Sequence, residues 1–195
     1  RSIAPSASEL TFEESELRFG YTAHADFKFA DENADDEGTH IYTWYIDGVI
    51  VEGVTGSEFV ISNAAYVGKE LTFSVLPVSD NPNDPKAEEA YMTDGYLILA
   101  NADFKPTVQY EAPAKITAFE EAEVEASLVE TFENMTDSSV FNWYIVNSSD
   151  ATIEDGAIPL VSGSTTATFE KEYNGKYAII EILPRATVAG EQYQG

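Results

Sequence analysis

The densest group of metal-ligating side chains lies in one short segment, residues 31–38. Its candidate ligands are Asp31, Asn33, Asp35, Asp36 and Glu37. Carboxylate and amide oxygens on a flexible loop are the ligands that Ca²⁺ prefers. The segment is not an EF-hand, because Asp36 stands where that loop needs glycine and Tyr42 where it needs a bidentate glutamate. It is either a calcium site of another kind or a solvated acidic loop without an ion.

Side chains suited to catalysis are sparse. The two histidines, His24 and His40, stand in no metal-ligand spacing such as His-x-x-x-His, and no Gly-x-Ser-x-Gly motif occurs. The absence of cysteine excludes disulfides, thiolate metal sites and cysteine nucleophiles. A glycosidase-like carboxylate pair cannot be picked out among 35 acidic residues, since their number makes any pairing uninformative. We therefore expect a chain that is not an enzyme.

The net charge of the chain limits the classes of partner that it can bind. With 35 Asp and Glu against 10 Lys and Arg, the net charge is −25. Such a surface repels nucleic-acid phosphates and anionic lipid headgroups, so neither is expected as a partner. It suits divalent cations or a cationic partner, or it serves only to keep an exposed protein soluble.

The chain carries no apolar run of the roughly 20 residues that a membrane helix needs. We therefore expect no membrane insertion. Residue 1 is Arg rather than Met, which we interpret as a processed or excised start.

The two halves of the sequence resemble each other. The segment Phe12–Leu17 returns as Phe119–Val124, 107 residues later. The Trp-Tyr-Ile of residues 44–46 returns at 143–145, an offset of 99. Residues 56–77 then match 163–184 without a gap, again at 107. Offsets that separate and rejoin indicate one scaffold, used twice, with loops of different length.

Within each half the apolar residues alternate with polar ones. Leu71, Phe73 and Val75 share one face, and Leu17, Phe19 and Tyr21 are expected to share another, which places His24 on the opposite, exposed side. Period-two patterns punctuated by Gly- and Asp-rich turns predict antiparallel strands packed on a core on one face. We therefore predict an all-β chain of two immunoglobulin-like sandwiches in tandem, residues 1–103 and 104–195.

Several motifs resemble the bacterial immunoglobulin-like modules of large secreted and cell-surface proteins. The first half reads Tyr42-x-Trp44-Tyr45-x-Asp47-Gly48 and later Val67-Gly68-Lys69-x-Leu71, and the second half keeps the tryptophan and the Gly-Lys pair. The resemblance implies that Trp44 and Trp143 are structural residues of strand C. It also implies an extracellular or cell-surface location, with neighbouring modules of the same parent chain as partners.

This topology predicts a second acidic loop beside the segment 31–38. In an immunoglobulin-like sandwich the B–C and F–G loops meet at one end. If residues 31–38 form the B–C loop, residues 79–85, which carry Asp80 and Asp84, form the F–G loop. We expect Ca²⁺, if it binds, to lie between them. The second half's equivalents, 134–139 and 185–190, are expected to be short, less acidic loops without such a site.

The leading functional hypothesis is a non-catalytic structural or adhesive segment, a spacer or protein-interaction module that Ca²⁺ could stabilise. The alternative is a carbohydrate-binding or accessory module of a secreted polysaccharide-degrading enzyme. Its aromatic platform would come from Tyr45, Tyr91, Tyr96 or Tyr110. A virion decoration module is a third possibility. The ligand, protein or glycan, is not specified by the sequence.

Overall fold

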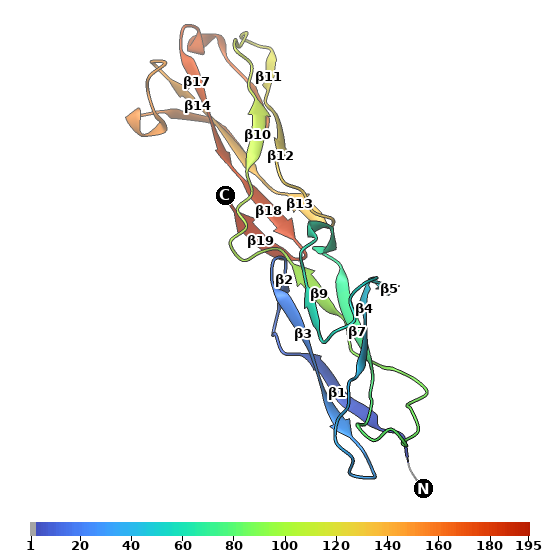
Figure 1. The fold of residues 1–195 in the computed structure, drawn as a ribbon. Coiled ribbons are helices and arrows are strands. Elements are labelled where there is room, and N and C mark those ends of the chain that lie inside the picture. Colours follow the sequence, from blue (N-terminus) through green and yellow to red (C-terminus); the bar gives the residue numbers. More distant parts are fainter. Residues whose placement is uncertain (1–2) are drawn as a thin grey trace. The chain divides into compact units, whose positions relative to one another are not determined.

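The computed structural model describes residues 3–195, which divide into two compact units. Unit 1 extends to Ala102 and includes Phe132–Asn134, and unit 2 comprises Asp103–Thr131 and Met135–Gly195. Arg1, on which the interpretation of a processed start rests, lies outside the described residues. The regular structure is β-strand, with three single 3₁₀ turns: η1 (Ala64–Tyr66), η2 (Ile153–Asp155) and η3 (Lys171–Tyr173). The all-β prediction is confirmed (Figure 1).

Unit 1 is built from two sheets. Its strands are β1 (Ser6–Phe12), β2 (Leu17–Arg18), β3 (Thr22–Ala30), β4 (Ile41–Ile46), β5 (Val49–Ile50), β6 (Glu58–Val60), β7 (Glu70–Leu76), β8 (Tyr91–Met92) and β9 (Tyr96–Leu99). One sheet has the order β1-β3-β6, and the other has the order β2-β9-β7-β4-β5, with β8 beside β7. The pairs are antiparallel except for β2 with β9. This order is that of an immunoglobulin-like sandwich in which the first strand switches sheets.

The core of unit 1 lies between these sheets. Trp44 of β4 is fully buried, with ring centroids 5.3 Å from Phe59 and 5.5 Å from Phe73. Leu71, Phe73 and Val75 are fully buried along β7, so the alternation predicted there is confirmed. Burial of several aromatic rings supplies the apolar area that a domain without disulfides needs.

Unit 2 has a comparable set of strands. They are β10 (Val108–Glu111), β11 (Glu121–Glu123), β12 (Glu125–Leu128), β13 (Met135–Asp137), β14 (Val140–Val146), β15 (Ile158–Ser162), β16 (Thr166–Thr168), β17 (Tyr177–Leu183), β18 (Arg185–Val188) and β19 (Glu191–Gln194). They form the ladders β10-β12, β11-β16, β15-β14-β17 and β13-β18-β19, all antiparallel.

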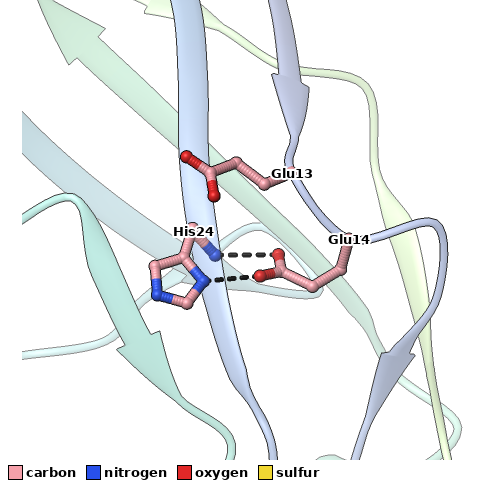
Figure 2. A group of neighbouring side chains, drawn as sticks. All are labelled: Glu13, Glu14 and His24. Atoms are coloured by element: carbon pink, nitrogen blue, oxygen red, sulfur yellow. Dashed lines mark hydrogen bonds and ion pairs between the residues drawn. The ribbon is translucent and has the colours of Figure 1, made fainter.

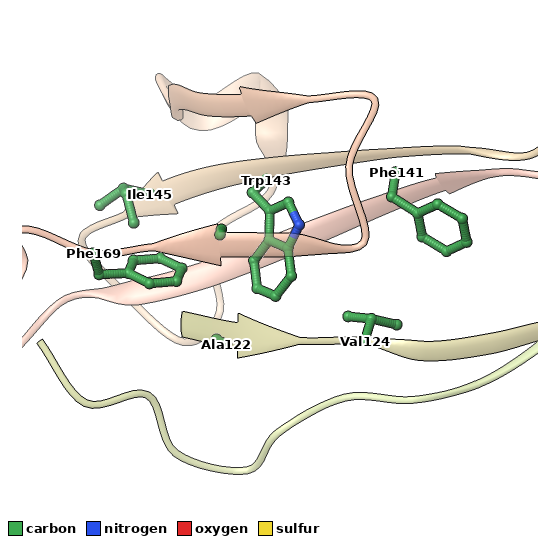
Figure 3. Close-up of a cluster of buried hydrophobic side chains, with 7 residues drawn as sticks. Ala122, Val124, Phe141, Trp143, Ile145 and Phe169 are labelled. Atoms are coloured by element: carbon green, nitrogen blue, oxygen red, sulfur yellow. The ribbon is translucent and has the colours of Figure 1, made fainter. Parts of the chain in front are cut away.

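The core of unit 2 is centred on Trp143. This side chain is fully buried and points from β14 toward Ala122 and Val124 of the facing layer (Figure 3). Its ring lies edge-on to Phe169, with centroids 5.8 Å apart. Both tryptophans are therefore core residues, and neither is exposed as a sugar platform.

The predicted core face of Leu17, Phe19 and Tyr21 is confirmed at Leu17 and wrong at Tyr21, while Phe19 is half-buried. Leu17 is buried, but Tyr21 is 48 % exposed. Strand β2 ends at Arg18, and the chain turns at Gly20, whose φ is +89°. Because of this turn, the alternation of buried and exposed residues in β2 does not continue into β3, where Ala23 is buried.

The two segments of unit 2 expected to be loops, 134–139 and 185–190, were also interpreted wrongly. Each contains a strand, β13 and β18, and the two pair with each other. Strand β18 continues into β19 through a tight turn at Ala189 and Gly190, which both have positive φ. Paired strands have their backbone groups committed to each other, so this end of unit 2 has no long loops comparable with those of unit 1.

Among the residues that the structure describes, no helix has the length and apolar character needed to cross a membrane.

Candidate metal centre

The two acidic loops of unit 1 meet, as the sandwich topology predicted. The backbone N–H of Gly38 donates to the carbonyl oxygen of Val78 at 2.8 Å, and that of Asp80 donates to the carbonyl oxygen of Asp36 at 2.9 Å. An isolated bridge pairs Glu37 with Ser79. The loops between β3 and β4 and between β7 and β8 are therefore joined by backbone contacts as well as by proximity.

Three carboxylates converge at this junction. Asp31, Asp35 and Asp84 each offer one oxygen, and these oxygens lie within 4.8 Å of one another. Asp31 Oδ1 accepts a hydrogen bond from the backbone N–H of Asn33 at 2.7 Å. Asp31 Oδ2 is buried and receives no hydrogen bond from residues 3–195. A buried carboxylate oxygen is costly without a donor or a cation beside it.

The pKa of Asp35 is shifted by its neighbours at this junction. The side-chain amide of Asn81 donates to Asp35 Oδ2 at 3.0 Å and favours the charged form. Desolvation, a hydrogen bond with Asp84 and the charges of Asp84 and Asp31 oppose it, and together they raise the pKa of Asp35. Like charges held this close favour the uptake of a proton or a cation.

The other four predicted ligands lie outside this convergence. Asn33, Asp36, Glu37 and Asp80 are exposed. The Asn33 amide donates to the carbonyl oxygen of Ile3 at 3.1 Å, and the Glu37 carboxylate lies 3.5 Å from His40 Nε2. Asp36 takes part through its backbone carbonyl. The structure thus brings together three of the seven predicted residues, one from the loop 79–85 and two from the loop 31–38.

A second group of ligating side chains was not predicted from the sequence. Glu13 and Glu14 follow β1, and their carboxylates lie beside His24 of β3 (Figure 2). The backbone N–H of Glu13 donates to the carbonyl oxygen of His24 at 3.0 Å. Glu14 Oε2 accepts from the backbone N–H of His24 at 2.9 Å, and Glu14 Oε1 lies 2.5 Å from His24 Nδ1. The usable signal was the antiparallel pairing of β1 with β3, because the register that pairs Phe12 with Ala25 continues to Glu13 beside His24.

The Glu14–His24 pair shifts the pKa of both groups. The hydrogen bond that His24 donates to Glu14 raises the pKa of His24; burial opposes this shift, and the charges of Glu14, Glu58 and Glu13 add to it. Burial raises the pKa of Glu14, but the backbone and side-chain hydrogen bonds from His24 outweigh it and leave that pKa below its ordinary value. Each partner therefore favours the charged form of the other.

The remaining histidine is a packing residue. His40 Nδ1 accepts a hydrogen bond from the backbone N–H of Val78 at 3.0 Å, and its ring lies 4.9 Å from that of Phe27 and 5.5 Å from that of Phe29. This contact network fixes the edge of the loop 31–38 against the sheet.

The tyrosines of the carbohydrate hypothesis differ in their surroundings. Tyr45 is half-buried, with its hydroxyl 3.3 Å from Ser74 Oγ, and Tyr96 packs on Phe12 with ring centroids 4.8 Å apart. Tyr91 is 38 % exposed and Tyr110 is 62 % exposed. Two of the four rings are thus engaged in packing rather than available as a platform.

No family model matches the chain, and no curated protein matches it. Solved structures of similar architecture are all-β domains. Three N-terminal domains of the Highly Immunogenic Outer Capsid protein (Hoc) of bacteriophage RB49 are 12 % identical, cover 97 % of this chain and 66 % of that one, and give a TM-score of 0.45. The chain spans slightly less than two thirds of the length of that structure.

Two further structures are more distant. A Ca²⁺-stabilised adhesin with which an Antarctic bacterium binds ice is 11 % identical, with 100 % of this chain and 47 % of that one covered and a TM-score of 0.32. A marsupial T cell receptor is 10 % identical, with 99 % and 72 % covered and a TM-score of 0.33.

Proposed function

We propose that the chain is a non-catalytic structural or adhesive segment of a larger extracellular or surface protein, and that Ca²⁺ stabilises its first unit at the loop junction. The observation that carries the calcium proposal is the convergence of Asp31, Asp35 and Asp84 together with the buried Oδ2 of Asp31. Three carboxylates supply part of the six to eight oxygens that Ca²⁺ takes, and backbone carbonyls and water complete the shell.

The physical benefit of a cation here is mechanical. Every charged residue of the loops 31–38 and 79–85 is an aspartate or a glutamate, and without an ion these charges repel one another. A bound divalent ion turns the repulsion into a cross-link between two loops at the same end of the β4–β7 pair, where Ile41 lies opposite Leu76. A module that transmits force or presents a neighbour benefits from such a rigid end.

The non-catalytic part of the proposal rests on how the described residues use their reactive groups. His40 is held in aromatic packing, and the His24 ring is hydrogen-bonded to Glu14. The acidic groups at the loop junction lie close enough to repel, which suits cation binding better than proton transfer between separated carboxylates.

Thermal unfolding of the full chain in excess EDTA and in millimolar CaCl₂ tests the calcium proposal. Extracellular modules bind Ca²⁺ with dissociation constants of roughly 10⁻⁴–10⁻³ M. At ten times Kd the ion stabilises the folded state by about 1.4 kcal/mol, which raises the Tm of a domain of this size by roughly 5 °C.

Variants Asp31→Asn and Asp84→Asn should lose this Ca²⁺ response. Asp80→Asn removes the same charge from the same loop but lies outside the convergence, so it should keep the response. A wild-type Tm that does not change with Ca²⁺, or a response that Asp80→Asn abolishes as fully as Asp31→Asn, contradicts the proposal.

A further inference from the structure

The second cluster of unit 1, formed by Glu13, Glu14 and His24, has the composition of a different metal site. One ring nitrogen and two carboxylate oxygens lie within 4.8 Å of one another. Figure 2 shows the Glu14 carboxylate facing the His24 ring and the Glu13 carboxylate above the same residue in this view. A mixed nitrogen and oxygen ligand set suits Zn²⁺, whereas Ca²⁺ prefers oxygen ligands alone.

The backbone holds these side chains in place. Phe12 of β1 pairs with Ala25 of β3, and the next residue, Glu13, donates its N–H to the His24 carbonyl. Glu14 is fixed through Oε2, which accepts the His24 backbone N–H. Its Oε1 is left facing Nδ1 at 2.5 Å. Glu13 and Glu14 lie in the bend that follows β1, and these backbone bonds tie that bend to the β1–β3 ladder.

A zinc ion fits between these groups with a small rearrangement. Zn–N and Zn–O bonds of about 2.0–2.1 Å in tetrahedral geometry separate two ligand atoms by about 3.3 Å. Opening the Nδ1–Oε1 distance from 2.5 Å requires a movement of less than about 1 Å, which the flexible glutamate side chain can make.

The other ring nitrogen of His24 has the partner expected of a metal-bound histidine. Nε2 lies 3.6 Å from Oε1 of Glu58, and His24 and Glu58 are directly opposite each other in the β3–β6 ladder. Histidines that bind a metal usually direct the second ring N–H to a carboxylate, which orients the ring and selects the tautomer. With Nε2 as the donor toward Glu58, a cation that displaces the hydrogen bond between Nδ1 and Glu14 would be bound by the Nδ1 lone pair.

The charge balance around the ring also favours a cation. Glu13, Glu14 and Glu58 face one imidazole, and in residues 3–195 no lysine or arginine forms an ion pair with any of the three. The cluster therefore stays negative even when His24 is protonated, and a divalent ion offsets that charge.

We propose that Glu13, Glu14 and His24 form a zinc-binding site on unit 1, with Glu58 orienting the imidazole. Three protein ligands leave a fourth position for water or for a ligand atom from a binding partner. The bound ion would also link the end of β1 to β3, which stabilises the outer strand of the β1-β3-β6 sheet.

Calorimetric titration of ZnCl₂ into the metal-free full chain, in a buffer without Ca²⁺, tests this site. We expect one specific site, a loss of affinity of tenfold or more in Glu14→Gln and Glu13→Gln, and its complete loss in His24→Gln. Glu13→Gln is the most informative variant because its carboxylate makes no hydrogen bond in the described chain, so the fold loses nothing with it. Glu9→Gln, an exposed charge-matched change in β1, is the control and should bind as the wild type does.

Nitrogen-15 spectra of the histidine rings provide a second readout. Zinc should shift Nδ1 of His24 and leave the His40 signals in place. Asp31→Asn should not alter zinc binding, which separates this site from the calcium site of the loops. Absence of zinc binding in the wild type, or wild-type affinity for zinc in His24→Gln or in Glu13→Gln, overturns the proposal.

Discussion

The indole Nε1 of Trp44 donates a hydrogen bond to the backbone carbonyl oxygen of Gly56 at 2.9 Å. The same bond recurs in unit 2, where Trp143 Nε1 donates to the carbonyl oxygen of Ser164, also at 2.9 Å. In each unit the bond ties the central strand to the segment that leads into the facing sheet. It gives a fully buried indole a partner for its single polar atom.

Trp44→Phe should destabilise unit 1 by about 2–3 kcal/mol, because the smaller ring leaves a cavity and the Gly56 carbonyl loses its donor. Urea unfolding followed by far-UV circular dichroism measures the loss. The fluorescence of the remaining Trp143 reports unit 2 alone in this variant. Trp143→Phe is the reciprocal experiment, with Trp44 as the reporter of unit 1. Unfolding midpoints that stay at the wild-type value in both variants contradict a structural role for the indoles.

The tryptophan bonds also show where the sequence comparison is accurate and where it is not. Residues 56–77 align with 163–184 without a gap, which makes Gly163 the counterpart of Gly56, yet Trp143 bonds to Ser164. The buried residues shift in the same way. Phe59 and Ile61 are buried in unit 1, but Ala167 and Phe169 are buried in unit 2, an offset of 108 rather than 107. A one-residue shift in a strand exchanges its faces, and only the packing reveals it.

Gly38→Ala should weaken the junction of the two acidic loops. A Cβ at this residue would lie 2.6 Å from the carbonyl oxygen of Ser79 and 2.8 Å from its carbon, both backbone atoms. Separating the loops costs about 1–3 kcal/mol of unit 1 stability, the usual range for overpacking. Chemical denaturation measures the change in the free energy of unfolding, and any stabilisation by Ca²⁺ should decrease with it.

The matched control is Gly56→Ala, whose Cβ would have Glu58 N at 4.0 Å as its nearest neighbour. Equal effects of the two changes contradict the close approach at Gly38.

The acid stability of unit 2 should depend on Asp155. Its Oδ2 accepts hydrogen bonds from the backbone N–H and the hydroxyl of Thr152 at 2.8 and 2.9 Å, and these bonds lower the pKa of Asp155 below its ordinary value of 3.8. The folded-state pKa is thus below the unfolded one. The stabilisation is therefore fully present above the unfolded pKa and is lost as pH falls through the folded pKa.

Unfolding of the wild type and Asp155→Ala, compared from pH 6 down to pH 2, checks this sign. The wild type should be the more stable of the two at pH 6, and the difference should shrink as the pH falls below 3.8. A difference that grows on acidification contradicts the assignment.

The calcium candidates were predictable only in part, for a reason of geometry. The sequence indicated which two loops would meet, because sandwich topology fixes that. It could not select Asp31, Asp35 and Asp84 from the seven acidic and amide residues, because loop residues follow no period that assigns them a face. The cluster of Glu13, Glu14 and His24 was missed for another reason. Glu13 and Glu14 follow β1, and their contact with His24 of β3 depends on the pairing register of β1 with β3.

Asn81→Asp should have opposite effects with and without calcium. Asn81 Nδ2 donates to Asp35 Oδ2 at 3.0 Å, so its replacement by aspartate removes a donor and adds a fourth carboxylate to the three that converge. In EDTA the variant should be less stable than the wild type by about 1–2 kcal/mol, since the added charge meets like charges and one hydrogen bond is lost. In saturating Ca²⁺ the same carboxylate becomes a ligand, and the increase in Tm should exceed that of the wild type.

Asn83→Asp adds the same charge two residues along the loop, at an exposed position, and should change neither value appreciably. If Asn81→Asp and Asn83→Asp respond alike to Ca²⁺, the ion is attracted by the net charge of the loops, and Asp31, Asp35 and Asp84 do not form a defined site.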